Sequence, residues 1–212
     1  MKNLVIIGAR GFGREVFDLA TNTQAFIDGE YQIKGFLDDK IDALEGYKGY
    51  PEIIDSVEHY TPEENDVFVC ALGTVQPKKE YAEMILAKGG EFINLVDLKA
   101  NVRSDISHLK GVLIFSFVFV SVDVTLSDFV SLQHFSCLGH DARVGKWSHM
   151  SSYSTITGYT VLEDEVMLQT GAKVVPKKTV GKGGFVGAGS LVIRNVKPGQ
   201  SVFGSPALPM TL

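Results

Sequence analysis

The sequence has little that would cross-link a fold or anchor it in a membrane. Only two of its 212 residues are cysteine, Cys70 and Cys137, and both lie in apolar runs, so we expect neither a disulfide framework nor a metal held by thiolates. The longest apolar stretch, around residues 112–122, carries serine and is too short to span a bilayer. The chain starts with a β-like segment and not with a secretory leader. These features predict a cytoplasmic protein without a membrane span.

Positive charge is also in deficit overall, because the formal net charge is −5 at pH 7. That balance argues against non-specific binding of nucleic acid. The charge is nevertheless uneven, since no Asp or Glu follows Glu165 and the basic residues of that stretch are Lys173, Lys177, Lys178, Lys182, Arg194 and Lys197. A small polyanionic ligand would be favoured there, and a solvated basic face without a ligand is the alternative.

Residues 1–98 alternate between strand-like and helix-like patterns. Strands are expected at 4–7, 32–37, 67–72 and 92–95, with a glycine turn at 8–13 and helices at 15–21 and 78–88. This order predicts a small parallel sheet of Rossmann-like style. The segment is too short for a complete dinucleotide fold, so we expect a half-size α/β domain.

Residues 99–212 follow a different period, because one large aliphatic residue recurs every six positions from Ile114 to Val192. A second column, two positions earlier, consists mostly of small or β-branched residues that we expect to turn tight corners. A hexapeptide repeat of this kind is typical of a triangular prism in which three steps make one coil. The fold class is therefore an α/β half domain followed by a left-handed parallel β-helix, and an ordinary β-sandwich is the disfavoured alternative.

Several segments resemble a family of bacterial sugar acetyltransferases, which includes PglD-like enzymes, GDP-perosamine N-acetyltransferases and NeuD-like sialic acid O-acetyltransferases. The segments that carry the resemblance are Val5–Gly13, Asp38-Asp39, Gly139-His140-Asp141, Ser148-His149 and Val202–Ala207. The resemblance implies a homotrimer that binds a nucleotide-sugar in the N-terminal domain and acetyl-CoA along the prism, without a metal. Leu208 and Pro209 differ from the family pattern, which generally has a basic residue after Pro-Ala.

His140 is the expected catalytic base under this resemblance. An acceptor amine or hydroxyl must lose a proton when it attacks a thioester, and an imidazole with an ordinary pKa of about 6.5 is suited to take it. Asp141 stands where the family usually has Glu and is the expected carboxylate partner. Neighbouring residues on a strand point to opposite faces, so a partner from elsewhere stays open, as does an exposed histidine without a role.

Cofactor contacts are implied for His149, Thr170 and Ala188, where Ala188 replaces a more usual Gly. Such contacts are mostly made by backbone groups, so a purely structural role stays open for each of the three. Cys137 is close to His140, but we interpret it as a small corner residue, and no cysteine acyl-enzyme is expected.

The substrate contacts are expected in the N-terminal half, at Gly11, Phe12, Gly13, Asp38, Asp39 and Gly73. Glycines between a strand and a helix let backbone N–H groups approach phosphate, and the two carboxylates can accept hydrogen bonds from a ribose or a base. Phe12 stands where the family often has His, which leaves the identity of the sugar and the nucleotide open. Gly73 can equally be a plain glycine at the end of a strand.

Three other classes of protein compete with this interpretation. Prisms of this kind also host zinc enzymes, for which His134, His140 and His149 are candidate ligands, although their spacing lacks a His-x4-His pair. A non-catalytic protein that binds nucleotide-sugars is the second. An NAD(P)-dependent dehydrogenase is the third, but no Tyr-x3-Lys pair follows the glycine turn. Within acetyl transfer, N-acetylation of an amino sugar is favoured and O-acetylation of sialic acid is the alternative.

Overall fold

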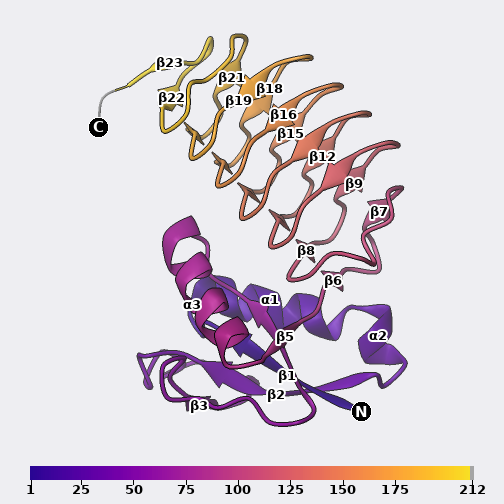
Figure 1. The fold of residues 1–212 in the computed structure, drawn as a ribbon, viewed down its shortest axis with the longest axis vertical. Helices are drawn as coiled ribbons and strands as arrows, with labels where there is room; N and C mark the ends of the chain where they lie inside the picture. Colours follow the sequence, from indigo (N-terminus) through magenta and orange to yellow (C-terminus); the bar gives the residue numbers. More distant parts are fainter. Residues whose placement is uncertain (211–212) are drawn as a thin grey trace. The chain divides into compact units, whose positions relative to one another are not determined.

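A computed structural model describes residues 1–210 of the chain (Figure 1). The chain divides into two compact units, Met1–Leu98 and Lys99–Leu212. Among the described residues, no helix is long and apolar enough to cross a membrane.

The N-terminal unit is built around a parallel sheet whose strands follow the order β3-β2-β1-β4-β5. Its strands are β1 (Lys2–Ile7), β2 (Tyr31–Leu37), β3 (Ile53–Asp55), β4 (Asp66–Cys70) and β5 (Glu91–Phe92). Its helices are α1 (Gly11–Thr21), α2 (Gln24–Ile27) and α3 (Val75–Ala87), and the short segment β6 (Leu95–Val96) follows β5. Leu4 to Ile7 are completely buried in β1, as expected for the central strand of a sheet covered on both faces.

The expected strands and helices of this unit are present, although several bounds differ and the strand expected at 92–95 is divided into β5 and β6. Helix α1 begins at Gly11 and helix α3 at Val75, both earlier than the sequence pattern predicts. Strand β3 and helix α2 were not expected. The early start of α1 shortens the glycine turn, so only Gly8 has a left-handed backbone, with φ of 96°. Gly13 is needed for space instead, because a Cβ there would lie 2.0 Å from the carbonyl oxygen of Gly8.

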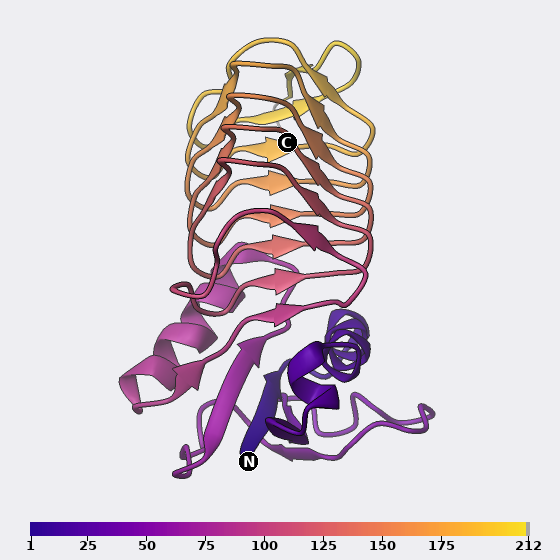
Figure 2. The ribbon, with the colours of Figure 1, turned by 90° about the vertical axis from the view of Figure 1, so that its right-hand side faces the viewer.

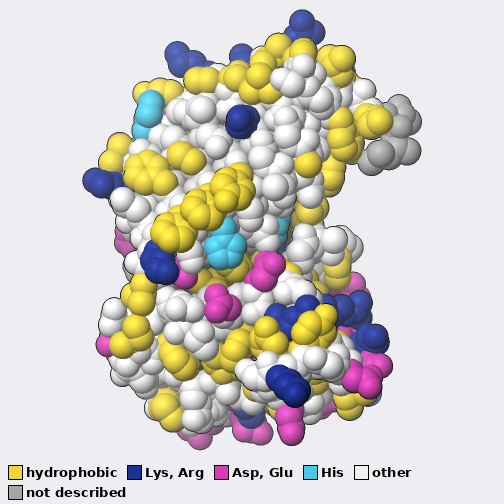
Figure 3. Space-filling model, turned by 180° about the vertical axis from the view of Figure 1, so that it is seen from behind, with side chains coloured by type: hydrophobic (Ala, Val, Ile, Leu, Met, Phe, Trp, Pro, Cys, Tyr) yellow, Lys and Arg dark blue, Asp and Glu magenta, His cyan; other side chains and the backbone are white. Residues whose placement is uncertain are grey.

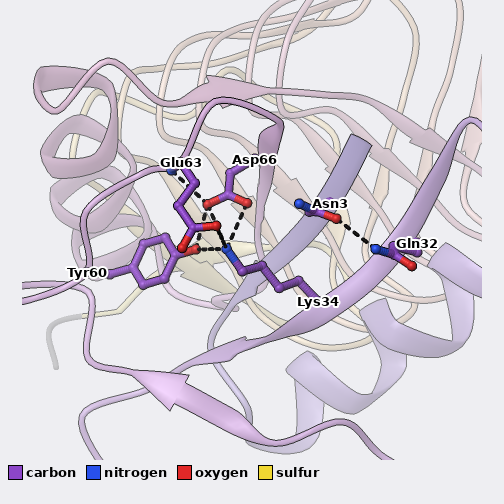
Figure 4. A network of polar contacts seen from close by, with 6 residues as sticks. All are labelled: Asn3, Gln32, Lys34, Tyr60, Glu63 and Asp66. Atoms are coloured by element: carbon purple, nitrogen blue, oxygen red, sulfur yellow. Dashed lines mark hydrogen bonds and ion pairs between the residues drawn. The ribbon is translucent and has the colours of Figure 1, made fainter. Parts of the chain in front are cut away.

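The N-terminal unit also contains an ionic network that ties strand β2 to strand β4 (Figure 4). The Lys34 ammonium donates to Asp66 at 3.0 Å and to Glu63 at 2.8 Å, and Tyr60 donates to Asp66 at 2.5 Å. Burial alone would raise the pKa of Asp66, but these hydrogen bonds lower it below its ordinary value. Burial and the bond to Asp66 raise the pKa of Tyr60 to about 12.

The second unit is a coil of short strands stacked in register, as Figure 2 shows. Equivalent residues lie one coil apart, and Ser131 pairs with His149, which pairs with Met167. The strands after β7 (Asn101–Val102) are β8 (Leu113–Ile114), β9 (Phe119–Val120), β10 (Thr125–Leu126), β11 (Ser131–Leu132), β12 (Cys137–Leu138), β13 (Arg143–Val144), β14 (His149–Met150), β15 (Thr155–Ile156), β16 (Val161–Leu162), β17 (Met167–Leu168), β18 (Lys173–Val174), β19 (Thr179–Val180), β20 (Phe185–Val186), β21 (Leu191–Val192), β22 (Ser201–Phe203) and β23 (Leu208–Pro209). The sequence prediction of a repeated-strand prism is therefore confirmed.

The aliphatic column fills the inside of this prism. None of its members from Ile114 to Val192 is more than 5% exposed. Much of the small column also points inward. Several of its hydroxyls donate to neighbouring carbonyls, as when Ser148 Oγ donates to Glu163 O at 3.0 Å, whereas the buried Ser154 Oγ has no hydrogen-bond partner. Most of the six-residue steps therefore bury two side chains, and these form the core of the prism.

The tight corners are made by a different column from the one the sequence indicates. The residue just before each small residue has a left-handed backbone, with φ near 60° at Phe135, Asp141 and Tyr159. This conformation costs about 1–2 kcal/mol for a residue with a Cβ, and the chain accepts it with aromatic side chains at many corners. The interpretation of Cys137 as a corner residue is wrong, because Cys137 lies in strand β12 and is half-buried.

Candidate functional site

His140 and Asp141 form a hydrogen-bonded pair on one corner of the prism. His140 Nδ1 lies 2.8 Å from Asp141 Oδ2, and both side chains are exposed to solvent. A carboxylate only accepts hydrogen bonds, so in this pair Nδ1 carries the proton and donates it. The neutral ring then has Nε2 unprotonated, which is the state that a general base requires.

The local backbone explains why two consecutive side chains meet. Asp141 has φ of 58°, so the chain turns a corner here between β12 and β13 and does not continue as a strand. Hydrogen bonds to the next coil fix this corner, from Gly139 N to Ile156 O at 2.8 Å and from Tyr159 N to His140 O at 3.0 Å. The concern that the two side chains point to opposite faces therefore does not apply at a corner.

Aromatic and small residues of the next coil surround the imidazole. The ring of Tyr159 is perpendicular to the ring of His140, with 5.2 Å between centroids. Gly158 lies beside the imidazole and leaves open the space that a side chain would occupy. Tyr159 thus packs against the imidazole of His140, and the neighbouring Gly158 leaves a gap beside it.

The expected cofactor contacts do not all lie together. Thr170 and Ala188 are exposed at the same corner of successive coils, and Gly189 N donates to Thr170 O at 2.9 Å. His149 belongs to strand β14, away from that corner column, and is 5% exposed. Gly171 and Gly189, next to the exposed pair, carry no side chains, so backbone groups are accessible along this corner.

A second candidate site is a cavity of about 290 Å³ in the N-terminal unit. It lies at the carboxyl ends of strands β1, β2 and β4, where ligands bind in open parallel sheets. Its lining residues are Gly8, Arg10, Leu37, Asp38, Asp39, Leu72, Thr74, Pro77 and Tyr81. The structure therefore brings the predicted Asp38 and Asp39 together, whereas the predicted Gly11, Phe12, Gly13 and Gly73 do not line this cavity.

The two carboxylates in the cavity have different surroundings. Asp38 is buried and accepts hydrogen bonds from Ala9 N and Lys40 N, both at 2.9 Å, and Arg10 lies 3.6 Å from it. Its charge therefore shapes the glycine turn. Asp39 is exposed and accepts a short hydrogen bond from the Tyr81 hydroxyl, and this bond, followed by burial, raises the pKa of Tyr81 to about 12.

The sequence interpretation missed Arg10 and Tyr81 as lining residues. Arg10 is the N-cap of α1 and its side chain is 70% exposed, so it is a cation close to the N-terminus of a helix. Thr74, Pro77 and Tyr81 are spaced by three and four residues at the start of α3. That spacing puts them on one helix face, and it was the available signal for Tyr81.

The three histidines of the zinc alternative have separate environments. His134 packs against Phe115, with 5.0 Å between ring centroids, and His140 pairs with Asp141. Within residues 1–210, no group of three or more His, Cys, Asp or Glu residues is placed to hold a metal ion.

Comparisons with known proteins cover both units. Residues 3–85 match the PglD N-terminal domain family. The acetyltransferase domain of PglB from Neisseria gonorrhoeae superposes with a TM-score of 0.87 at 27% identity, covering 99% of this chain and 100% of that one. PerB from Caulobacter crescentus, solved with CoA and GDP-perosamine, superposes with a TM-score of 0.87 at 21% identity over 100% of this chain and 98% of that one. At this lower identity, PerB supports the fold alone.

A curated relative matches a smaller part of the chain. A serine acetyltransferase from Bacillus licheniformis is 44% identical over 45 residues, which is 21% of this chain and 21% of that protein. The fold, the repeat and these likenesses place the chain in the class of left-handed β-helix acetyltransferases. Within this class, residues 3–85 match the PglD N-terminal domain family, and the chain is similar in structure to the acetyltransferase domain of PglB.

Proposed function

We propose that this protein transfers an acetyl group from acetyl-CoA to the amine of a nucleotide-linked amino sugar used in surface glycans. The observation that carries the proposal is the exposed His140–Asp141 pair, with Nδ1 and Oδ2 at 2.8 Å, on an acetyltransferase fold. The PglB domain at 26% identity was solved in complex with acetyl coenzyme A, which supports acetyl-CoA as the donor. Assembly as a homotrimer in the cytoplasm is part of the same proposal.

His140 acts as the general base in this proposal and Asp141 holds its tautomer. Nε2 accepts a proton from the acceptor amine while the amine nitrogen attacks the carbonyl carbon of the thioester. A C–N bond forms, the C–S bond breaks, and CoA leaves as a thiolate that takes up the proton from Nε2 of His140, which returns the imidazole to its neutral state. Backbone N–H groups along the prism stabilise the negative charge that develops on the carbonyl oxygen.

Direct transfer to the acceptor needs no acyl-enzyme. Burial raises the pKa of the Cys137 thiol above its ordinary value, which lowers the fraction of reactive thiolate. Thr170, Ala188 and His149 remain the proposed contacts of acetyl-CoA, and the first two lie on an accessible corner.

The N-terminal cavity is the proposed nucleotide site. Arg10 and the N-terminus of α1 suit a diphosphate, because the cationic side chain and the helix dipole favour anions. Asp39 suits hydrogen-bond donors of a ribose or base, since its carboxylate is exposed. Gly11, Phe12, Gly13, Asp38 and Gly73 are proposed to shape this site or to contact the substrate.

A panel assay tests the proposal. Purified protein is mixed with acetyl-CoA and UDP-, GDP- or dTDP-linked 4-amino sugars or free sialic acid, and thiol release is followed together with acetylated product. We expect release with one amino-sugar nucleotide, and an unchanged rate in Cys137→Ser. Release with sialic acid alone would replace N-acetylation by O-acetylation, and tight nucleotide-sugar binding without release would indicate a non-catalytic binding protein.

A further inference from the structure

The coil that follows His140 leaves a gap beside the imidazole. Gly158 lies 18 residues after His140, at the same corner of the next coil. A Cβ at Gly158 would lie 2.7 Å from both Cε1 and Nε2 of His140 and 3.3 Å from Cδ2. The two distances of 2.7 Å are shorter than the contacts that Cβ atoms make with non-bonded heavy atoms. The present position of the ring therefore depends on the absence of a side chain at residue 158.

The backbone of Gly158 does not itself require glycine. The glycines and other residues with left-handed φ in this unit include Gly171, Gly183 and Gly189, and Gly158 is not among them. The conformation at residue 158 is open to any L-residue. Space for the imidazole is a physical reason for glycine at this corner.

Tyr159 restrains the same ring from another direction. Its ring is at 89° to the imidazole with 5.2 Å between centroids, an edge-to-face arrangement that aromatic pairs favour. Lys177 Nζ lies 6.0 Å from the centroid of Tyr159, which adds a cation–π contact to the tyrosine ring. The tyrosine thus contacts the histidine below it and the lysine of the following coil.

We propose that Gly158 and Tyr159 are positioning residues for His140, which together with Asp141 hold the imidazole in the orientation for proton transfer. Gly158 gives the ring its place and Tyr159 limits its rotation. The role in catalysis rests on the proposed function, whereas the effect on the ring can be observed in the protein alone. Displacing a reacting group by about 1 Å can lower a rate about a hundredfold.

The first test reads the protonated nitrogen of His140 directly. Protein labelled with ¹⁵N-histidine is studied without substrates at pH 8, above the ordinary pKa of an imidazole, about 6.5, and the His140 signals are assigned by their loss in His140→Asn. We expect wild type to carry the proton on Nδ1, and Gly158→Ala to show a mixture of the two tautomers because the displaced ring loses its bond to Asp141. An unchanged tautomer in Gly158→Ala would overturn the role of Gly158.

The second test uses kinetics to separate positioning from folding. Gly158→Ala is expected to lower kcat by about tenfold to a hundredfold with KM for both substrates within about twofold, because the clash is with a side chain that can swing aside. Pro176→Ala is the matched control, since it changes the same corner one coil further on, and it should retain wild-type kcat. A fall in kcat of the same size in the control would contradict the proposal.

Tyr159 variants complete the test. Tyr159→Phe keeps the ring and should retain wild-type kcat, whereas Tyr159→Ala should lose about tenfold. An equal loss in both variants would assign the effect to the hydroxyl and overturn positioning by the ring. If wild type transfers acetyl to no acceptor, the proposed function fails, and the tautomer measurement still decides whether Gly158 positions the ring.

Discussion

The two units of this chain obtain their stability in different ways. In the β-helix unit each coil repeats the contacts of the one before it, so Leu138 lies between Val120 and Ile156 in a ladder of equivalent residues. In the N-terminal unit the decisive contacts occur once, as in the network of Lys34, Tyr60 and Asp66. One repeated sequence pattern therefore determines many buried contacts, whereas each single contact between distant residues requires its own pair of residues.

The largest expected effect is a cavity inside the prism. Leu138→Ala should lower the free energy of unfolding by about 3 kcal/mol, because Leu138 is completely buried and the stacked coils cannot collapse into the space. Denaturant unfolding at one fixed protein concentration measures the change. Arg143→Ala, at an exposed position of β13, is the control with an expected change below about 0.5 kcal/mol. A loss below about 1 kcal/mol in Leu138→Ala would show that the ladder yields more easily than this account holds.

The second effect breaks the single network of the N-terminal unit. Lys34→Met should lower the free energy of unfolding by about 2–3 kcal/mol, because it leaves the fully buried carboxylate of Asp66 without its cation. Gln32→Met changes the same strand at an exposed hydrogen bond to Asn3, which Figure 4 also shows, and should have little effect. Equal stability of both variants would mean that the network contributes nothing net.

The sequence predicted these two interiors unequally, for a physical reason. Every aliphatic residue of the six-residue column is buried, because a period is visible without any knowledge of partners. The Lys34–Asp66 contact joins residues 32 positions apart, and nothing local marks either one as a partner of the other. Strand β3 was missed for the same reason, since its three residues have no period of their own.

In the candidate sites, too, the sequence predicted individual residues but not the contacts between them. His140 and Asp141 were predicted from the resemblance, yet their contact depends on a left-handed backbone at Asp141, which a strand pattern does not show. Asp38 and Asp39 were predicted as a pair, but only the structure distinguishes the one that shapes the glycine turn from the one that is exposed. Tyr81 reaches Asp39 across 42 residues, so its place in the cavity required the fold.

A third effect is the pH dependence of the stability that Tyr60 gives to the N-terminal unit. The folded-state pKa of Tyr60 is raised to about 12 from an ordinary value of 10.0, so the unfolded chain loses this proton first. The stabilisation from neutral Tyr60 is therefore complete below pH 10 and declines as the pH rises from 10 towards 12. Unfolding measured from pH 9 to 11 should show a steeper decline for wild type than for Tyr60→Phe, and parallel curves would contradict the assignment.

The smallest effect concerns the outer aromatic ladder of the prism. Phe135 stacks between Phe117 at 5.0 Å and Tyr153 at 4.8 Å and is 44% exposed, and hydrophobic side chains gather on the surface of this unit (Figure 3). Phe135→Ala should lower the free energy of unfolding by about 1 kcal/mol, because two stacked contacts are lost at a solvent-exposed corner. A loss as large as that of Leu138→Ala would mean that the outer ladder stabilises the prism as much as its interior does.

In the proposed mechanism, the prism carries out proton transfer and the N-terminal unit recognises the nucleotide. Acetyl transfer by His140→Asn at saturating acetyl-CoA and amino-sugar nucleotide tests it most directly, with nucleotide-sugar affinity measured in parallel and His108→Asn, at an exposed histidine, as control. We expect kcat to fall about a thousandfold with affinity within twofold of wild type, and the control to behave as wild type. Transfer by His140→Asn at the wild-type rate would contradict the account.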